Sequence, residues 1–153
     1  TVQPDGDQPY NLTKAYPWSH EFEADIIVLM LGSNDSKPEN WKGADKFKEE
    51  YLDLINSYMN TENPPELILC TPPTAYFPDG VTEGLSNYDV QPIIIEEIAD
   101  IVKDVAKDNG YILININDLT DNRRELFGKD NVHPNNDGAE EISSAVYKFI
   151  INL

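Results

Sequence analysis

The chain has 153 residues, of which 40% are hydrophobic, and this length and composition are typical of one globular domain that buries a core. Its 28 acidic and 11 basic side chains give a formal net charge of -17, spread along the sequence, which argues against a binding site for nucleic acid or for an anionic membrane. The longest apolar stretch, residues 24–31, contains Asp25 and is too short to span a bilayer.

The first segment, residues 1–23, is polar and contains Pro4, Pro9 and Pro17 without helical or strand periodicity. We expect an ordered or half-ordered lead-in loop there, followed by a single domain over residues 24–153. The N-terminus shows no signal peptide and no initial Met, so we expect that an upstream segment has been removed. Cys70 is the single cysteine, which excludes an intrachain disulfide and leaves the cellular compartment open.

Three short, β-rich apolar runs predict three strands, over residues 25–31, 66–70 and 111–116. The first run ends at Gly32 and the second at Thr71-Pro72-Pro73. Continuous apolar runs are typical of strands that are covered on both faces, as in a parallel sheet.

The segments after these runs show the periodicity of helices. The second helix should begin near Pro92, which a first turn tolerates, and end at Asn109-Gly110, a C-terminal cap signal. The third should begin at a capping box formed by Asp137 and Glu140. The expected buried positions of the three helices are Phe47, Tyr51, Leu54, Ile55 and Tyr58; Ile94, Ile98, Ile101, Val102 and Val105; and Ala139, Ile142, Val146, Phe149 and Ile150.

Strand and helix alternate three times, which indicates right-handed crossovers and a three-layer α/β fold with a parallel sheet. The loop over residues 71–89 carries Tyr76, Phe77 and Tyr88 and follows the carboxyl end of the second strand, where open α/β sheets bind ligands. This loop either lines the substrate-binding site or is an ordinary surface loop.

The segment Asp130-Asn131-Val132-His133-Pro134 lies in a loop just before the last helix. The two intervening residues let the carboxylate of Asp130 fold back onto the His133 imidazole, where it would orient the ring as a general base. A surface turn with a chance histidine is the alternative.

Gly32-Ser33-Asn34-Asp35 follows the first strand, at the edge of the sheet where α/β folds place their sites. The side-chain amide of Asn34 could donate a hydrogen bond to a developing oxyanion. Alternatively, the segment is only a turn and a cap, and we expect Asp35 or Ser36 to cap a helix around Trp41.

These two segments, with Thr71-Pro72-Pro73 between them, resemble the GDSL or SGNH hydrolase family of esterases and lipases, from about Ala24 to the C-terminus. The resemblance implies a flavodoxin-like fold, of which this chain would supply three strands with their helices, as the C-terminal part of the domain. It also implies an oxyanion-hole asparagine, Asn34, and an acid and base, Asp130 and His133. The context of Asn34 and Trp41 is similar to members that deacetylate carbohydrates.

The chain departs from the family pattern because it has neither the N-terminal Gly-Asp-Ser block that carries the nucleophile nor the glycine block that follows it. Ser33 lacks the Gly-x-Ser-x-Gly elbow that exposes a nucleophile. Ser36 is better explained as a cap, and Ser19 beside His20 as a surface pair. We therefore expect the nucleophilic serine, with the first strand-helix units, to lie outside this chain.

Two other classes of function stay open. The chain could be a carbohydrate-binding or scaffolding module that kept the fold and lost catalysis. It could also be a metal-dependent phosphoesterase that uses its acid-rich loops, although no zinc or calcium spacing is present around His133.

The sequence therefore predicts a serine ester hydrolase that removes O-acetyl or other small acyl groups from carbohydrate, without a metal or organic cofactor. Gly32, Ser33, Trp41 and Tyr76 are candidate substrate contacts. This chain alone should be inactive without its nucleophile. The open edge of strand 25–31 should promote self-association. The compartment is not determined, and the kind of substrate favours a secreted or periplasmic protein.

Overall fold

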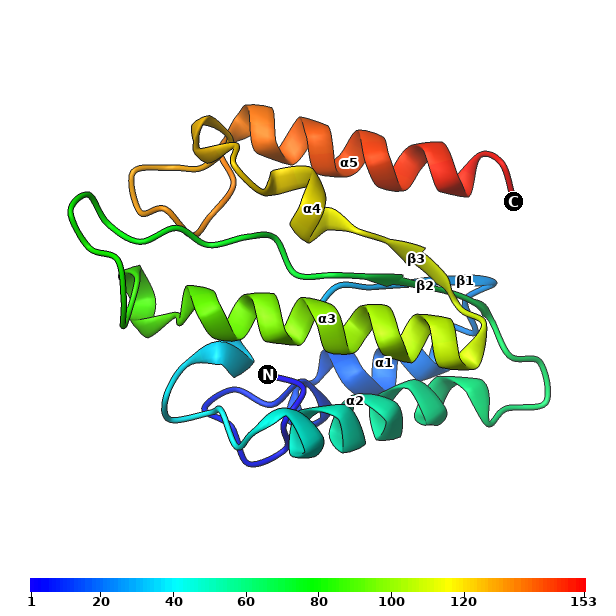
Figure 1. The fold of residues 1–153 in the computed structure, drawn as a ribbon. Helices are drawn as coiled ribbons and strands as arrows, with labels where there is room; N and C mark the ends of the chain where they lie inside the picture. The colour runs from blue at the N-terminus through cyan, green and yellow to red at the C-terminus, as the bar shows by residue number, and fades with distance from the viewer.

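The computed structural model describes all of residues 1–153 and confirms the predicted parallel α/β fold (Figure 1). Three parallel strands lie in the order β1-β2-β3, and each is shorter than or equal to its predicted run. They are β1 (Ile26–Leu29), β2 (Glu66–Cys70) and β3 (Ile112–Ile114). The α-helices are α1 (Ala15–Glu21), α2 (Ala44–Met59), α3 (Pro92–Asn109), α4 (Ile116–Thr120) and α5 (Asn136–Ile150). Four 3-10 turns, η1 to η4, span Tyr10–Leu12, Asn34–Ser36, Asn87–Asp89 and Arg124–Leu126.

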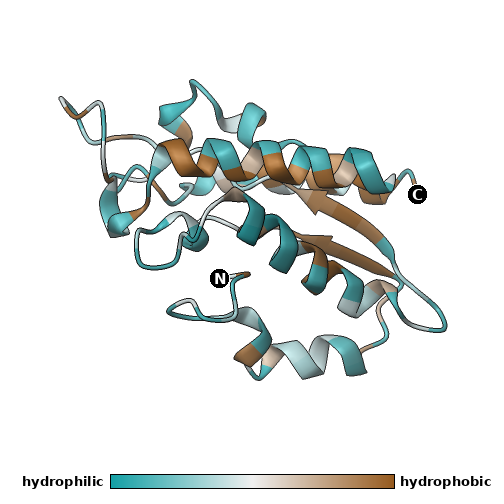
Figure 2. Ribbon diagram, turned by 60° about the horizontal axis from the view of Figure 1, so that its bottom comes forward, coloured by the Kyte–Doolittle hydropathy of each residue, from teal (hydrophilic) through white to brown (hydrophobic).

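The central strand β2 is buried on both faces, which explains its continuous apolar run. Leu67 and Leu69 pack with α2 and α3, whereas Ile68 and Cys70 pack with β3 and α5. Figure 1 shows α2 and α3 on one side of the sheet and α5 on the other. In Figure 2 the strands are brown along their length and the helices alternate brown and teal, as expected for a sheet between amphipathic helices. Burial of each of these aliphatic side chains stabilises the folded state by about 1.5–3 kcal/mol relative to leaving it exposed.

Local signals set both ends of α3 and the start of α5. Helix α3 begins at Pro92 and ends before Gly110 in the left-handed conformation (φ 74°), as predicted. The capping box is wrong, because Asn135 caps α5 by accepting a hydrogen bond from the backbone N–H of Gly138. Ala139 and Phe149, predicted to be buried, are exposed, since only one narrow face of α5 meets the sheet.

Residues 1–23 contain η1 and the short helix α1, which the sequence did not predict. Pro17 is tolerated in α1 because it lies in the first turn, where backbone N–H groups have no partner within the helix. The helix packs through Tyr16 and His20 on Tyr58 of α2, and such a polar aromatic contact leaves no apolar periodicity in the sequence.

Strand β1 has a neighbour on one side only. Its residues Ile26 and Val28, with Met30 just after it, are 36%, 38% and 40% exposed. Val28 is paired with Ile68 and therefore faces the side of the sheet on which α5 packs over β2 and β3. The edge and one face of β1 are thus open. None of the helices combines the length and hydropathy that crossing a membrane requires.

Candidate active site

Asp130 and His133 lie in a short loop between η4 and α5 that backbone hydrogen bonds hold closed. Phe127 and Pro134 form an antiparallel bridge, and the N–H of Gly128 donates to the carbonyl of His133 at 2.8 Å. A β-carbon on Gly138 would collide with the carbonyl oxygen of Leu126, so only glycine lets α5 begin this close to the loop. The loop is therefore fixed at both ends.

The Asp130 carboxylate contacts His133 in two ways. Its Oδ2 lies 3.1 Å from His133 Nδ1, and its Oδ1 accepts the backbone N–H groups of His133 and Val132 at 2.9 and 3.0 Å. These N–H groups, first that of His133 and then that of Val132, lower the pKa of Asp130. The carboxylate is thus ionised near neutral pH, which favours the imidazole tautomer with its proton on Nδ1. Nε2 of His133 makes no hydrogen bond within the chain and the side chain is 64% exposed.

Asn34 lies at the start of η2, just beyond β1, and its side chain is exposed. Its backbone carbonyl accepts a hydrogen bond from Asn40 Nδ2 at 2.8 Å, while its own side-chain amide bonds to nothing else in the chain. Asn40 is itself 1% exposed and accepts the N–H of Asp7. The backbone of Asn34 is therefore fixed and its amide is free to bind a ligand.

Asp35 and Ser36 do not cap a helix, contrary to the prediction. Asp35 is fully buried, and its carboxylate accepts the N–H groups of Val2 at 2.8 Å and Gln3 at 3.0 Å. Burial raises the pKa of Asp35, and these N–H groups act against that rise. Ser36 donates to the carbonyl of Ser33, and α2 begins only at Ala44. Asp35 instead anchors the N-terminal segment beneath Asn34.

Residues 87–91, which include η3, link the turn at Asn34 to the loop that carries His133. Gln91, just before α3, donates through Nε2 to the carbonyl of Ser36 at 2.7 Å. Asn87 Nδ2 donates to the carbonyl of Asp130 at 2.7 Å, and the ring of Tyr88 meets His133 edge-on, with centroids 4.9 Å apart. The aromatic residues of the 71–89 loop gave the only sequence signal for this link.

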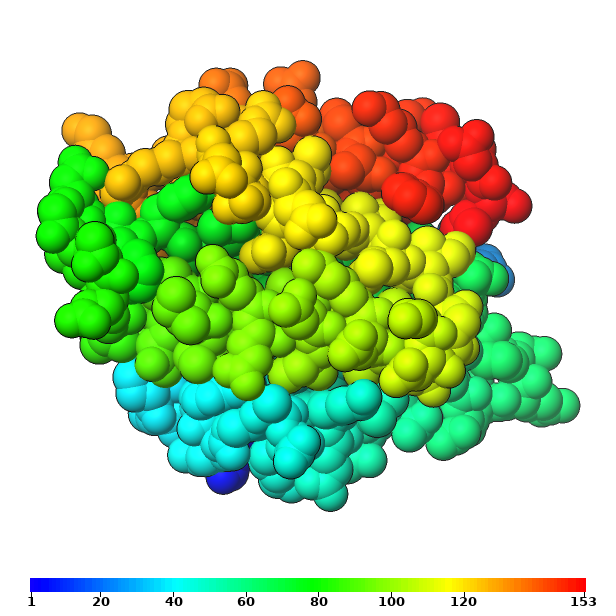
Figure 3. Space-filling model, in the orientation of Figure 1, coloured from blue at the N-terminus to red at the C-terminus, as the bar shows by residue number.

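The elements that carry these residues lie at the carboxyl ends of the strands, at the left of Figure 1. Figure 3 shows the green surface of the loop after β2 against the yellow-orange surface of the segment after α4. Tyr76 joins the two, since its N–H donates to the carbonyl of Asn131 and its hydroxyl bonds to Thr120 and Arg123. This edge is where open α/β sheets bind ligands.

The candidate substrate contacts differ in their burial and in the contacts that they already make within the chain. Gly32 is buried and packs against Ile98, and Trp41 packs against Phe47 with the core around α2 and α3. Tyr76 is held by its hydroxyl, by Phe127 and by the Arg124 guanidinium over its ring. Ser33, Trp41 and Tyr76 are all half-buried, and of these the Ser33 hydroxyl makes no hydrogen bond within the chain.

Comparison with known proteins identifies the family. Residues 1–146 match the model of the GDSL-like lipase/acylhydrolase family. The chain belongs to this family. An acetylxylan esterase of Xylanibacter ruminicola is 28% identical over an aligned length of 159 residues, and the match covers 92% of this chain. The match covers 32% of that esterase, so the chain spans about a third of its length.

Solved structures of similar fold include a lipase/acylhydrolase from Enterococcus faecalis, with a TM-score of 0.70 and 20% identity over 92% of this chain and 66% of that chain. A carbohydrate acetylesterase from Sinorhizobium meliloti has a TM-score of 0.73 and 17% identity, over 99% of this chain and 74% of that chain. At these identities the likeness shows the fold, and this chain accounts for a part of it.

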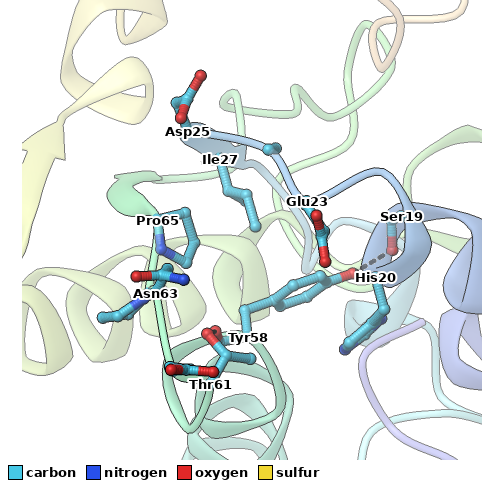
Figure 4. A pocket seen from close by; sticks show the side chains of 12 residues that line it. Ser19, His20, Glu23, Asp25, Ile27, Tyr58, Thr61, Asn63 and Pro65 are labelled. Carbon is cyan, nitrogen blue, oxygen red and sulfur yellow. Dashed lines mark hydrogen bonds between the residues drawn. The ribbon is translucent and has the colours of Figure 1, made fainter.

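None of the serine hydroxyls of this chain hydrogen-bonds to His133, which matters because the sequence resemblance implies a serine nucleophile. The Ser19 and His20 side chains do not bond to each other. Ser19 bonds to the Tyr58 hydroxyl at 2.7 Å, and His20 Nε2 lies 3.3 Å from Ser57 Oγ. They line a cavity of about 530 Å³ between α1 and the loop before β2 (Figure 4). This cavity lies at the amino ends of the strands, away from His133.

The other side chains of chemical interest are Cys70 and the possible metal ligands. Cys70 is fully buried in β2, and burial raises the pKa of its thiol to about 11. No three His, Cys, Asp or Glu side chains lie close enough together to hold a metal ion.

Proposed function

We propose that this chain is the His-Asp part of an esterase that removes small acyl groups, and O-acetyl groups of carbohydrate in particular. The observation that carries the proposal is the contact of Asp130 Oδ2 with His133 Nδ1 at 3.1 Å, in a loop that leaves Nε2 outward. Membership of the acylhydrolase family and the similarity to an acetylxylan esterase support the reaction class and the substrate class.

In this mechanism His133 Nε2 takes the proton of a serine hydroxyl as that oxygen attacks the ester carbonyl. Asp130 holds the Nδ1 tautomer and stabilises the imidazolium that forms. His133 then gives the proton to the leaving alcohol, and the same steps run with water to release the acid. The chemistry needs no metal or organic cofactor.

Asn34 is the proposed side-chain donor to the oxyanion. Its backbone is fixed through Asn40, and its exposed amide makes no hydrogen bond within the chain, so the amide is free to donate to the oxyanion. Loss of one such donor typically lowers kcat by about 10²–10³-fold. Ser33, beside it, stays a proposed substrate contact with Gly32, Trp41 and Tyr76, and its hydroxyl makes no hydrogen bond within the chain.

The nucleophile is proposed to come from a part of the parent protein beyond these 153 residues, because no serine of this chain bonds to His133. The isolated chain should then be inactive, since loss of the serine of a triad lowers turnover on the order of a millionfold. A substrate alcohol and acyl group would bind at the joint surface of the two parts.

The test uses the parent protein with an aryl acetate and with acetylated xylo-oligosaccharides. His133→Ala should abolish hydrolysis, and Asn34→Ala should lower kcat with little change in KM. The isolated chain should neither hydrolyse the ester nor label with a fluorophosphonate. Rapid labelling of Ser33 or another serine in the isolated chain would contradict the external nucleophile, and full activity of His133→Ala would contradict the whole mechanism.

A non-catalytic carbohydrate-binding module is the second candidate, and the lack of a serine beside His133 favours it. It predicts glycan binding that His133→Ala leaves unchanged. The two candidates are separated by one experiment, hydrolysis of the bound glycan ester by the parent protein.

A further inference from the structure

The turn Asn87–Asp89 has an unusual backbone. Tyr88 (φ 59°, ψ 26°) and Asp89 (φ 59°) both adopt the left-handed conformation, which costs free energy for residues with a β-carbon. Two such residues in succession persist only when the surrounding structure holds them. Such strain is concentrated at functional sites, so the contacts of this turn are informative.

Both ends of the turn are anchored. The N–H of Ser86 donates to the carbonyl of Val90 at 2.7 Å, and Ser86 Oγ donates to the carbonyl of Tyr76 at 2.6 Å. Ser86 and Val90 are 7% and 2% exposed, and helix α3 begins two residues after Val90. The buried anchors force the three residues between them outward.

Burial does not explain why a tyrosine occupies the strained position. Tyr88 is 58% exposed, and its ring lies edge-on to the His133 imidazole at 4.9 Å and 81°. Its neighbour Asn87 donates to the carbonyl of Asp130 at 2.7 Å. The strained turn therefore touches both members of the Asp130–His133 pair, one through the ring and one through the backbone.

The His133 side chain has few other restraints. It is 64% exposed, and its contacts are the Asp130 carboxylate on one edge and the Tyr88 ring. A single hydrogen bond leaves an exposed ring free to change rotamer, whereas a second contact on a different edge restricts it.

We propose that Tyr88 is a positioning residue, which holds the His133 ring in the rotamer that keeps Nδ1 on Asp130 and Nε2 outward, while Asn87 holds the Asp130 backbone. The proposal rests on the proposed function for its catalytic consequence. Its structural content, the rotamer of His133, does not depend on activity. An edge-to-face aromatic contact typically changes a population by about twofold to tenfold.

The structural test is NMR on the 153-residue chain, which has only two histidines, so His20→Gln assigns the His133 signals. Three-bond couplings across the Cα–Cβ bond of His133 should report one rotamer in the wild type and in Tyr88→Phe, and an average over several in Tyr88→Ala. Asp89→Gly is the matched control, because it removes the neighbouring strained residue and keeps the ring. One fixed rotamer in Tyr88→Ala would overturn the proposal.

The kinetic test uses the parent protein. Tyr88→Ala should lower kcat for aryl acetate by about threefold to tenfold with KM unchanged, and Tyr88→Phe and Asp89→Gly should stay near wild type. An unchanged kcat in Tyr88→Ala contradicts the positioning role. If the wild-type parent shows no ester hydrolysis, the proposed function fails, and the NMR result still decides the role of Tyr88.

Discussion

Gly32 and Ile98 approach so closely that a β-carbon on residue 32 would lie 2.7 Å from Ile98 Cγ2. Gly32 also has φ 124°, a conformation that side chains rarely adopt. This contact joins the end of β1 to α3, and the next residues form the Asn34 turn. A glycine at this position therefore sets the distance between the sheet, the helix and the proposed oxyanion donor.

Gly32→Ala should destabilise the chain by about 1–3 kcal/mol, through backbone strain and the clash with Ile98. Chemical denaturation of the variant measures the loss. Gly43→Ala is a matched control, since Gly43 also has a positive φ (100°) but no atom within 4 Å of the added carbon. The two variants share the strain, so an equal loss in both would show that the contact with Ile98 contributes nothing.

Tyr51→Phe should leave the free energy of unfolding unchanged or raise it by about 1 kcal/mol. Tyr51 is fully buried, its hydroxyl has no hydrogen-bond partner, and its ring stacks on Phe47, so only the unsatisfied hydroxyl is lost. The control is Tyr58→Phe, whose hydroxyl bonds to Ser19 and Tyr10 and whose removal should cost about 1 kcal/mol. Thermal or urea unfolding measures the stability of both variants. A larger loss of stability in Tyr51→Phe than in Tyr58→Phe would contradict the absence of a hydrogen-bond partner for the Tyr51 hydroxyl.

Asp130 should make the stability of the chain depend on pH in the acid range. Its folded pKa is lowered by the N–H groups of His133 and Val132, so its stabilising contribution is present above the ordinary value of 3.8 and is lost as the pH falls through the folded pKa. Urea unfolding from pH 6 to pH 2 should show the difference between the wild type and Asp130→Asn shrinking toward the lowest pH. A constant difference over this range would contradict the lowered pKa.

The isolated chain should self-associate through β1. Its edge is unpaired and the exposed Ile26, Val28 and Met30 line one face, which together form a template for another strand. Sedimentation velocity should show species that grow with concentration, and Val28→Lys should reduce them. Ile93→Lys, at a 58% exposed position on α3, is the control that adds the same charge elsewhere. A compact monomer at all concentrations would contradict this prediction.

The contact of Asp130 with His133 could be predicted because two residues three positions apart in one loop can reach each other whatever surrounds them. The strands and the long helices were predictable for a similar reason, since runs such as residues 66–70 and the periodicity of α2 and α3 record burial directly. Local signals such as Pro92 and Gly110 fixed the ends of α3.

Other features were decided only by contacts between distant segments. The role of Asp35 depends on Val2, 33 residues earlier, and without that contact the sequence suggests a helix cap. The Tyr88 turn meets His133 only because the loops after β2 and α4 meet at one edge of the sheet. Sequence alone determined which segments form the core and which two residues form the proposed acid-base pair, because the periodicity of apolar residues and a short spacing are local properties. The tertiary structure decided which residues contact that pair, because these partners are polar, exposed and far apart in the chain.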